Sequence, residues 1–217
     1  MQLFFEKIKV LRSDSLLDVG GFPAFWKETP QFCERLDVIN IDFKHDHFQV
    51  EADQPWIRTS YANALQLPYS GKSYEIVFSN SVIEHLHSHE HQIKFAQEVN
   101  RVGKRIWIQT PAYEFFIEPH YITPFIHWIP KNIRRKVLRY FTIWGWIERP
   151  NQKTIDASIE EIRLLNFQEF QALFPDCLIL REKFLGIFTK SYIAVKKSLM
   201  YGFSSLLRTR GHDIMRG

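Results

Sequence analysis

The stretch SLLDVGGFPAFW, residues 15–26, decides the fold class of this chain. It begins as a short apolar strand that contains one acid, Asp18, and it continues into a turn at Gly20 and Gly21. Such a turn presents backbone N–H groups to anionic or polar ligand groups, and glycine lets a ligand approach the backbone closely. Phe22 and Pro23 then stand where a phosphate-binding loop would continue with small residues. The stretch therefore predicts a ligand-binding loop of unusual composition.

Apolar strand patterns that alternate with helical patterns follow this loop. We expect helices over residues 24–36 and 91–102, and strands over 36–43, from 57 onward, over 73–81 and over 105–110. This alternation is typical of a mostly parallel sheet covered by helices on both faces. Asp42 lies near the end of the second strand, where an acid can accept hydrogen bonds from both hydroxyls of a ribose.

The C-terminal part predicts a different strand arrangement. A helix over 167–174 precedes two strands, over 177–184 and 191–197, that only a few residues around Gly186 connect. A parallel pair would need a crossover of about a dozen residues or more, so this short link predicts an antiparallel pair.

Four ordered segments, LLDVGG, INIDF, ANALQLPYSGKSYEIVFSNSVIEHL and EVNRVGKRIWIQTP, resemble the motifs of class I S-adenosylmethionine-dependent methyltransferases. The resemblance is to the small-molecule, type 11-like branch; it is dense over residues 15–111 and looser over 159–197. It implies an α/β fold with a Rossmann-like, seven-stranded, mostly parallel sheet, an antiparallel last strand and helices on both faces. It also implies an enzyme that transfers a methyl group by in-line displacement to a small molecule, and the aromatic side chains of residues 113–157 suggest a sugar or lipid-linked acceptor.

The resemblance assigns cofactor-binding roles by position. Asp18 and Gly20 would lie beneath the methionine part of S-adenosylmethionine, Gly21 would let the backbone of the loop approach the cofactor, and Asp42 would bind its ribose. Around the adenine it implies Asn63, Ala64 and Leu65, and at the methionine end Ser79 and Asn80. Asn63 stands where the family usually has an Asp, but its carbonyl oxygen can still accept a hydrogen bond from the adenine amino group.

The loop departs from the family pattern at Phe22, where a second spaced glycine is common. A ring at this position either blocks the cofactor or packs away from it, with Pro23 starting the next helix. A non-catalytic scaffold or regulatory partner that kept the fold is therefore an alternative to the enzyme. A nicotinamide-dependent oxidoreductase is a further alternative, although the GxGxxG fingerprint is not met.

Four residues are candidates for the catalytic chemistry or for contact with the acceptor. His85 follows the fourth strand and can act as a base or orient the acceptor. Tyr113 follows the fifth strand, and Glu118 and His120 lie two residues apart in the segment EPH as a possible acid–base pair. Each of them can equally be a packing or salt-bridging residue.

The segment HLHSHEH places four histidines at alternate positions, and His87 and His91 could share one face of a helix. Without a cysteine or an HExxH pattern beside them, we expect no metal site.

Residues 113–157 hold many aromatic side chains and predict an insertion, after the fifth strand, that covers the acceptor site. Within it, residues 130–144 predict a basic amphipathic helix. We expect the whole chain, residues 1–217, to form a single domain that ends in a basic amphipathic tail over residues 198–217. Both suggest peripheral contact with a membrane, unless their apolar faces are buried in the core.

The net charge of +4 is carried by the residues from Lys196 onward and the rest of the chain is neutral overall, so we expect no nucleic-acid partner. Three features of the sequence predict a cytoplasmic location, with contact at the inner face of the membrane as an option. The two cysteines are far apart, the N-terminus has charges among its apolar residues, and the apolar runs are shorter than a membrane span. An oligomeric state is not predicted.

Overall fold

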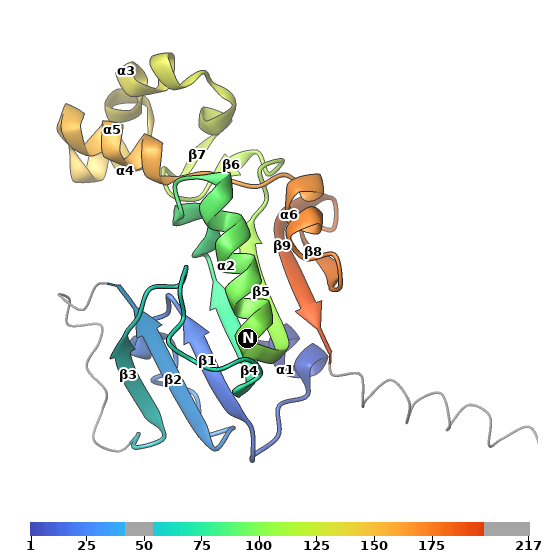
Figure 1. Cartoon of the computed structure of the whole chain (residues 1–217). Helices are drawn as coiled ribbons and strands as arrows, with labels where there is room; N and C mark the ends of the chain where they lie inside the picture. Colours follow the sequence, from blue (N-terminus) through green and yellow to red (C-terminus); the bar gives the residue numbers. More distant parts are fainter. Residues whose placement is uncertain (42–53, 198–217) are drawn as a thin grey trace, which may run out of the picture.

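The computed structural model describes residues 1–41 and 54–197. A seven-stranded sheet forms its centre, in the order β3-β2-β1-β4-β5-β9-β8 (Figure 1). The strands are β1 Ser15–Val19, β2 Arg35–Asn40, β3 Ile57–Tyr61, β4 Tyr74–Asn80, β5 Gly103–Pro111, β8 Leu178–Phe184 and β9 Phe188–Lys196. The first five strands pair in parallel, while β9 is antiparallel to both β5 and β8. The predicted mostly parallel sheet with an antiparallel last strand is confirmed.

The two faces of the sheet carry separate apolar cores because successive side chains of a strand point to opposite faces. On β1, Leu17 and Val19 belong to one core, and Leu16 belongs to the other. The helices α2, His89–Val102, and α6, Phe167–Leu173, cover the first face. Helix α1, Gln2–Ile8, covers the second face with Phe4 and Ile8.

The prediction of a helix over residues 24–36 is wrong. Only a short 3₁₀ turn, Pro23–Phe25, forms there, and the chain then continues without regular structure to β2. Pro30 lies in the middle of the segment and would break a helix. Trp26 is fully buried instead, with its ring 5.2 Å from that of Phe78 on β4. Part of the aromatic excess of the chain therefore fills the second face of the sheet rather than the insertion.

The insertion between β5 and α6 is largely helical, as expected. It contains the small hairpin β6 Ile117–Glu118 and β7 Thr123–Pro124, the 3₁₀ turn Ile126–Trp128, and the helices α3 Lys131–Phe141, α4 Ile143–Glu148 and α5 Gln152–Glu161. It has an apolar core of its own, made by Tyr121, Ile126, Leu138, Ile155 and Ile159. Figure 1 shows the three helices beyond the carboxyl ends of the parallel strands.

One helix predicted over 130–144 is in fact two. Thr142 is extended, donates its hydroxyl to the carbonyl of Leu138 at 2.6 Å and accepts from the N–H of Gly145 at 2.8 Å. It thereby ends α3 and caps α4. Tyr140 and Phe141 are 65% and 68% exposed, whereas Val137 and Trp144 pack against the apolar core of the insertion, so the predicted face is only partly buried.

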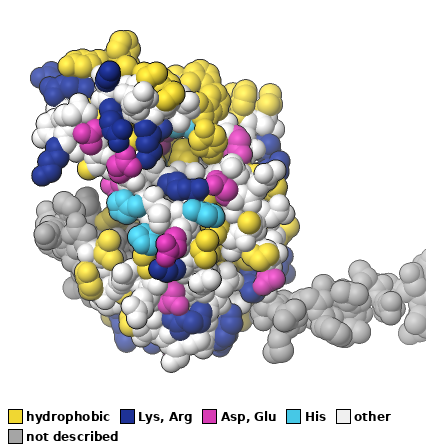
Figure 2. All heavy atoms as spheres, turned by 45° about the horizontal axis from the view of Figure 1, so that its top comes forward, with side chains coloured by type: hydrophobic (Ala, Val, Ile, Leu, Met, Phe, Trp, Pro, Cys, Tyr) yellow, Lys and Arg dark blue, Asp and Glu magenta, His cyan; other side chains and the backbone are white. Residues whose placement is uncertain are grey.

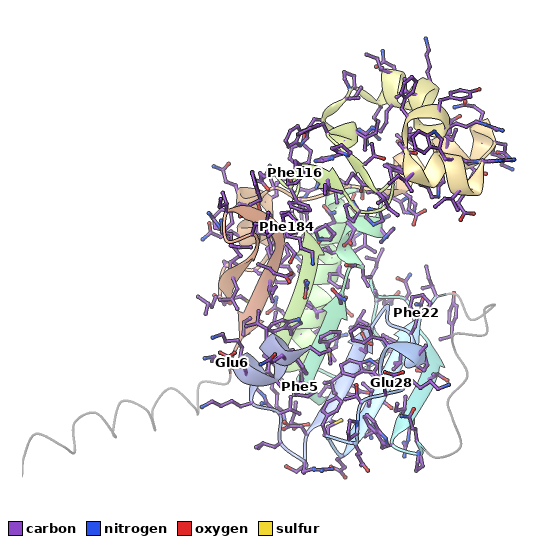
Figure 3. The ribbon with its side chains drawn as sticks, turned by 180° about the vertical axis from the view of Figure 1, so that it is seen from behind. Phe5, Glu6, Phe22, Glu28, Phe116 and Phe184 are labelled. Carbon is purple, nitrogen blue, oxygen red and sulfur yellow. The ribbon has the colours of Figure 1, made fainter. Side chains whose placement is uncertain are left out.

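The start of the insertion packs against the β8–β9 hairpin. Phe116 and Phe184, labelled in Figure 3, have ring centroids 6.4 Å apart. The hairpin turns at Gly186, whose φ of 72° is readily available to glycine. The predicted tail over 198–217 lies outside the described residues. Among the helices that the structure does describe, none combines the length and the apolar character that crossing a membrane requires.

Candidate active site

A cleft of about 660 Å³ opens at the carboxyl ends of β1, β2 and β3. This position is next to the point where the strand order reverses, between β1 and β4, which is where open α/β sheets bind ligands. The cleft falls in the size range of small-molecule sites. The predicted residues that line it are Gly20, Asn63, Ala64, Leu65 and His85.

The glycine loop after β1 is held in shape by its own backbone and by Asn40. Gly20 has a φ of 77°, and its N–H donates to the carbonyl of Ile39 at 2.7 Å. The side-chain amide of Asn40 donates to the carbonyls of Gly20 and Gly21, at 3.2 Å each. A Cβ on Gly20 would lie 2.6 Å from Val82 Cγ2. The loop therefore requires glycine at position 20 both for its conformation and for its contact with Val82.

Asp18 lies behind this loop rather than on the cleft wall. It is 1% exposed, its Oδ2 accepts from the indole N–H of Trp26 at 2.7 Å, and its Oδ1 has no hydrogen-bond partner among the described residues. Burial raises the pKa of Asp18 to about 7, although the Trp26 hydrogen bond lowers it. A Cβ on Gly21 would lie 1.9 Å from Asp18 Oδ2, so this glycine makes room for the carboxyl group.

Phe22 lines the cleft and is 42% exposed. Its backbone is extended, and Pro23 takes the first position of the 3₁₀ turn. Figure 3 shows Phe22 at the end of the sheet that faces the insertion. Phe22 is therefore part of the wall of the cleft, and a cleft of about 660 Å³ remains beside it.

The predicted adenine residues form a tight turn after β3. The Oδ1 of Asn63 accepts from the N–H of Leu65 at 2.9 Å, and Asn63 forms an isolated bridge with Gln66. This turn presents Ala64 and Leu65 to the cleft as an apolar wall.

Two other predicted cofactor residues stand off the cleft wall. Ser79 is 1% exposed and donates to the carbonyl of Val19 at 2.8 Å, which ties β4 to β1. Asn80 is half-buried and is not among the residues that line the cleft. Ser81 and Val82, which follow directly, line it instead. Asp42 lies outside the described residues.

Four side chains join the insertion to the end of β4 in a continuous chain. Glu118 Oε1 lies 2.6 Å from His120 Nδ1, His120 Nε2 lies 3.1 Å from His85 Nε2, and His85 Nδ1 lies 2.9 Å from Glu161 Oε1. His85 and Glu161 line the cleft, and Glu118 is 1% exposed. Figure 2 shows histidine side chains gathered on the face below the insertion. The predicted pair Glu118 and His120 is therefore brought to His85, at the border of the cleft.

The carboxylates around the histidines shift the ionisation of the group. Burial lowers the pKa of His120, but the hydrogen bond and charge of Glu118 and the charges of Glu84 and Glu161 raise it, and the net shift is upward. Glu84 is fully buried beside them, and burial raises its pKa. Its Oε2 accepts from the hydroxyl of Thr110 on β5 at 2.9 Å.

Tyr113 does not line the cleft. Its carbonyl faces His127 Nε2 at 2.9 Å, and its ring packs edge-on against the His127 ring. The structure thus places Tyr113 in the packing of the insertion.

Sequence reasoning missed Glu84, Glu161 and Asn40. Glu161 lies on α5, far along the chain from His85, and only the folded insertion brings the two together. Asn40 carried a usable signal, because it directly precedes Ile41 and Asp42 at the end of β2, where side chains reach the glycine loop.

Residues 17–105 match the family described as methyltransferase domain. This match and the fold confirm the resemblance noted in the sequence. A comparison with curated proteins finds no match.

Solved structures with the same fold are distant in sequence. A SAM-dependent methyltransferase from Aquifex aeolicus aligns with a TM-score of 0.52 and 13% identity, over 89% of this chain and 88% of that one. A Rhodobacter sphaeroides protein, proposed in its own description to be a Zn-dependent alcohol dehydrogenase, aligns with a TM-score of 0.58 and 11% identity, over 89% and 87%.

Phosphoethanolamine N-methyltransferase 2 of Haemonchus contortus, solved with S-adenosyl-L-methionine, aligns with a TM-score of 0.55 and 11% identity over 83% of this chain. This chain spans 37% of the length of that enzyme and 25% of phosphoethanolamine N-methyltransferase 1 of the same organism. At such identities these structures show the fold alone.

Proposed function

We infer, from the methyltransferase domain that residues 17–105 carry, that this chain is an S-adenosylmethionine-dependent methyltransferase. The observation that supports this most directly is the position of the cleft. Gly20, the turn over residues 63–65 and His85 line the cleft, and all of them lie within the matched residues 17–105. When bound, S-adenosylmethionine supplies a methyl group already activated by its sulfonium.

The residues present fit this cofactor. The glycine at position 20 keeps the backbone of the loop accessible, and the wall of Ala64 and Leu65 suits an adenine. We propose that Asp42 binds the ribose hydroxyls and that Asn40 keeps the loop in its binding shape.

We propose further that His85 meets the acceptor. Two members of the four-residue chain, His85 and Glu161, line the cleft, and of these His85 is the one that contacts His120, through its Nε2 atom. Glu161 and Glu118 hold the two rings in place through their Nδ1 atoms. These residues orient the acceptor, and the insertion covers the site.

The acceptor is a bulky small molecule or a lipid-linked molecule in this proposal. Exposed apolar side chains cover the corner between α3 and α4, with Phe141 and Ile147 each 68% exposed and Trp146 63% exposed. Figure 2 shows apolar side chains, mixed with basic ones, over the insertion above the cleft face. An apolar surface of this kind marks a site of contact with a membrane or a partner, and we propose a membrane surface that presents the acceptor.

Calorimetry with S-adenosylhomocysteine tests the cofactor site. We expect binding, and we expect Asp42→Ala to weaken it by about 10- to 150-fold, since a lost hydrogen bond to a charged group costs about 1.5–3 kcal/mol. The variant Asp176→Ala, at a side chain 79% exposed on the far edge of the sheet, is the control and should bind as the natural chain does. Absence of binding by the natural chain at millimolar ligand would favour the non-catalytic scaffold instead.

A further inference from the structure

The imidazoles of His85 and His120 face each other with their Nε2 atoms 3.1 Å apart. The Nδ1 atom of each ring is already paired with a carboxylate, that of Glu161 or of Glu118. A neutral imidazole with its proton on Nδ1 keeps a lone pair on Nε2. Two lone pairs therefore point at one another, an arrangement that needs a cation or a shared proton between them.

The carboxylate of Glu84 completes this cluster. Glu84 is fully buried, one of its oxygens accepts from Thr110, and its Oε1 has no hydrogen-bond partner in the part of the chain that the structure describes. One ligand atom each from Glu84, His85 and His120 all lie within 4.8 Å of one another. An unsatisfied carboxylate oxygen in such a place is costly unless a positive group joins it.

We propose that Glu84, His85 and His120 bind a divalent transition-metal ion. Zn²⁺ is the ion with which this is tested. Nitrogen ligands lie about 2.0–2.1 Å from zinc, so two of them are separated by about 2.9 Å at octahedral and about 3.3 Å at tetrahedral angles. The observed 3.1 Å lies between these values. Two imidazoles and one carboxylate form a donor set that first-row transition metals favour over Mg²⁺.

The surroundings of the three ligands match those of metal sites. Ligating histidines usually donate their other N–H to a carboxylate, which fixes the ring and raises its basicity. Glu118 and Glu161 stand in that position here, and Thr110 holds Glu84 in the same way. All three ligands thus have a supporting hydrogen bond.

An ion accounts for more of the site than a shared proton does. A proton between the two Nε2 atoms would leave the Glu84 oxygen unsatisfied. The acids Glu84, Glu118 and Glu161 also surround the two rings, and the nearby Arg163 is paired with Glu169 instead. A divalent charge offsets this excess of carboxylates more completely than one proton.

The ion would border the cleft through His85, so an oxygen of the acceptor can enter its open coordination positions. A metal ion lowers the pKa of a bound hydroxyl and stabilises the oxyanion. The acceptor then loses its proton to solvent, the O–CH₃ bond forms as the S–CH₃ bond breaks, and the ion keeps its oxidation state. This assignment of an oxygen acceptor rests on the proposed methyl transfer, whereas ion binding does not.

The sequence-based expectation of no metal considered only the HLHSHEH segment. Of its four histidines the proposed site uses His85 alone; the other two ligands are Glu84, directly before it, and His120 from the turn between β6 and β7.

Calorimetry with ZnCl₂ on the chelator-treated full chain tests the proposal, with MgCl₂ in parallel. We expect one equivalent of Zn²⁺ to bind and Mg²⁺ not to bind. His120→Gln and Glu84→Gln should abolish zinc binding, and Glu118→Gln should weaken it by about 10- to 100-fold. His89→Gln, at an exposed histidine, and His91→Gln are the matched controls and should bind zinc unchanged.

Co²⁺ supplies a second readout, because its visible spectrum reports nitrogen ligation and should disappear in His120→Gln. Thermal melts of the metal-free variants check their folding. Zinc binding that survives in His120→Gln and Glu84→Gln, or that disappears in His91→Gln, would overturn the proposal. Zinc binding without S-adenosylhomocysteine binding would refute the proposed function and leave the metal site standing.

Discussion

At the scale of one residue, the motif predicted where Asp18 lies relative to the glycine loop better than it predicted what the Asp18 side chain contacts. The sequence placed this acid beneath the cofactor, and the structure places it behind the glycine loop, bonded to Trp26. Trp26 could not be linked to Asp18 from the sequence, because the segment after Pro23 looked helical and the hydrogen bond depends on its irregular path. Its neighbours Gly20 and Asn63 line the cleft as the motif implies.

The raised pKa of Asp18 predicts a pH-dependent stability. Its pKa is 3.8 as an ordinary carboxyl and about 7 when folded. Between these values the folded chain keeps a proton that the unfolded chain has lost, so stability falls as pH rises through this range. Asp18→Asn removes this loss, and its stability relative to the natural chain should rise by about 4 kcal/mol from pH 4 to pH 8.

Urea denaturation at a series of pH values measures the difference. Asp176→Asn, at an exposed carboxylate, serves as the control and should show a nearly constant difference. A flat profile for Asp18→Asn as well would mean that Asp18 is ionised in the folded chain at neutral pH.

A comparison of Gly20 with Gly186 distinguishes the cost of backbone strain from the cost of a steric clash when glycine is replaced by alanine. Both have positive φ, 77° and 72°, but a Cβ meets Val82 only at Gly20 and meets nothing within 4 Å at Gly186. Gly186→Ala should cost about 1–2 kcal/mol from φ alone. Gly20→Ala should cost about 1–3 kcal/mol more from overpacking, and it should weaken S-adenosylhomocysteine binding.

The double variant Gly20→Ala/Val82→Ala removes both methyl groups that the new Cβ would meet and should recover most of the additional loss, measured by urea denaturation. If Gly20→Ala were no worse than Gly186→Ala, the contact with Val82 would not be what limits position 20.

At the scale of elements, strands were predicted more reliably than helices. The sheet was predicted correctly from the strand patterns of β1, β4 and β5 and from the short link at Gly186. A short apolar run between turn residues is compatible with few structures other than a buried strand. The helices failed where one local interaction decides the outcome. Thr142 splits the helix predicted over 130–144, and Pro30 prevents the one predicted over 24–36.

The exposed corner between α3 and α4 predicts membrane contact by apolar insertion rather than by charge. The basic side chains of α3 are partly neutralised, since Lys131 pairs with Glu160 and Arg135 with Asp156 and Glu160. We therefore expect the chain to sediment with phospholipid vesicles and to remain bound when the salt concentration is raised.

Phe141→Ser/Trp146→Ser should reduce the bound fraction severalfold. Leu11→Ser changes a residue 45% exposed before β1, at the other end of the sheet, and should not alter it. Equal binding of all three proteins, or release of the natural chain by salt, would contradict an apolar docking surface.

At the scale of the whole molecule, one buried ion pair fastens the N-terminal segment to the centre of the sheet. Arg105 on β5 lies 2.6 Å from Asp14, with both side chains at most 6% exposed, and it also donates to the carbonyl of Ile8. No pattern in the sequence linked these residues, because the pairing depends on where α1 returns across the sheet.

Arg105→Met should destabilise the chain by about 3–5 kcal/mol, because it leaves the charge of Asp14 buried without its partner. The neighbouring Lys104→Met breaks an exposed pair with Glu75 and should cost less than about 1 kcal/mol. Denaturation curves of the two variants give the comparison; similar losses for both would show that burial does not distinguish the pairs.

The place of β9 between β5 and β8 has a consequence for biosynthesis. β5 is complete at Pro111, but the strand that pairs with its free edge begins only at Phe188. During synthesis, the five strands β1 to β5 therefore leave the ribosome, with an open edge at Ile106, Trp107 and Ile108, long before the partner of β5 emerges. Unpaired edges of this kind recruit other chains, so slow translation of the insertion would favour aggregation of the nascent protein over folding.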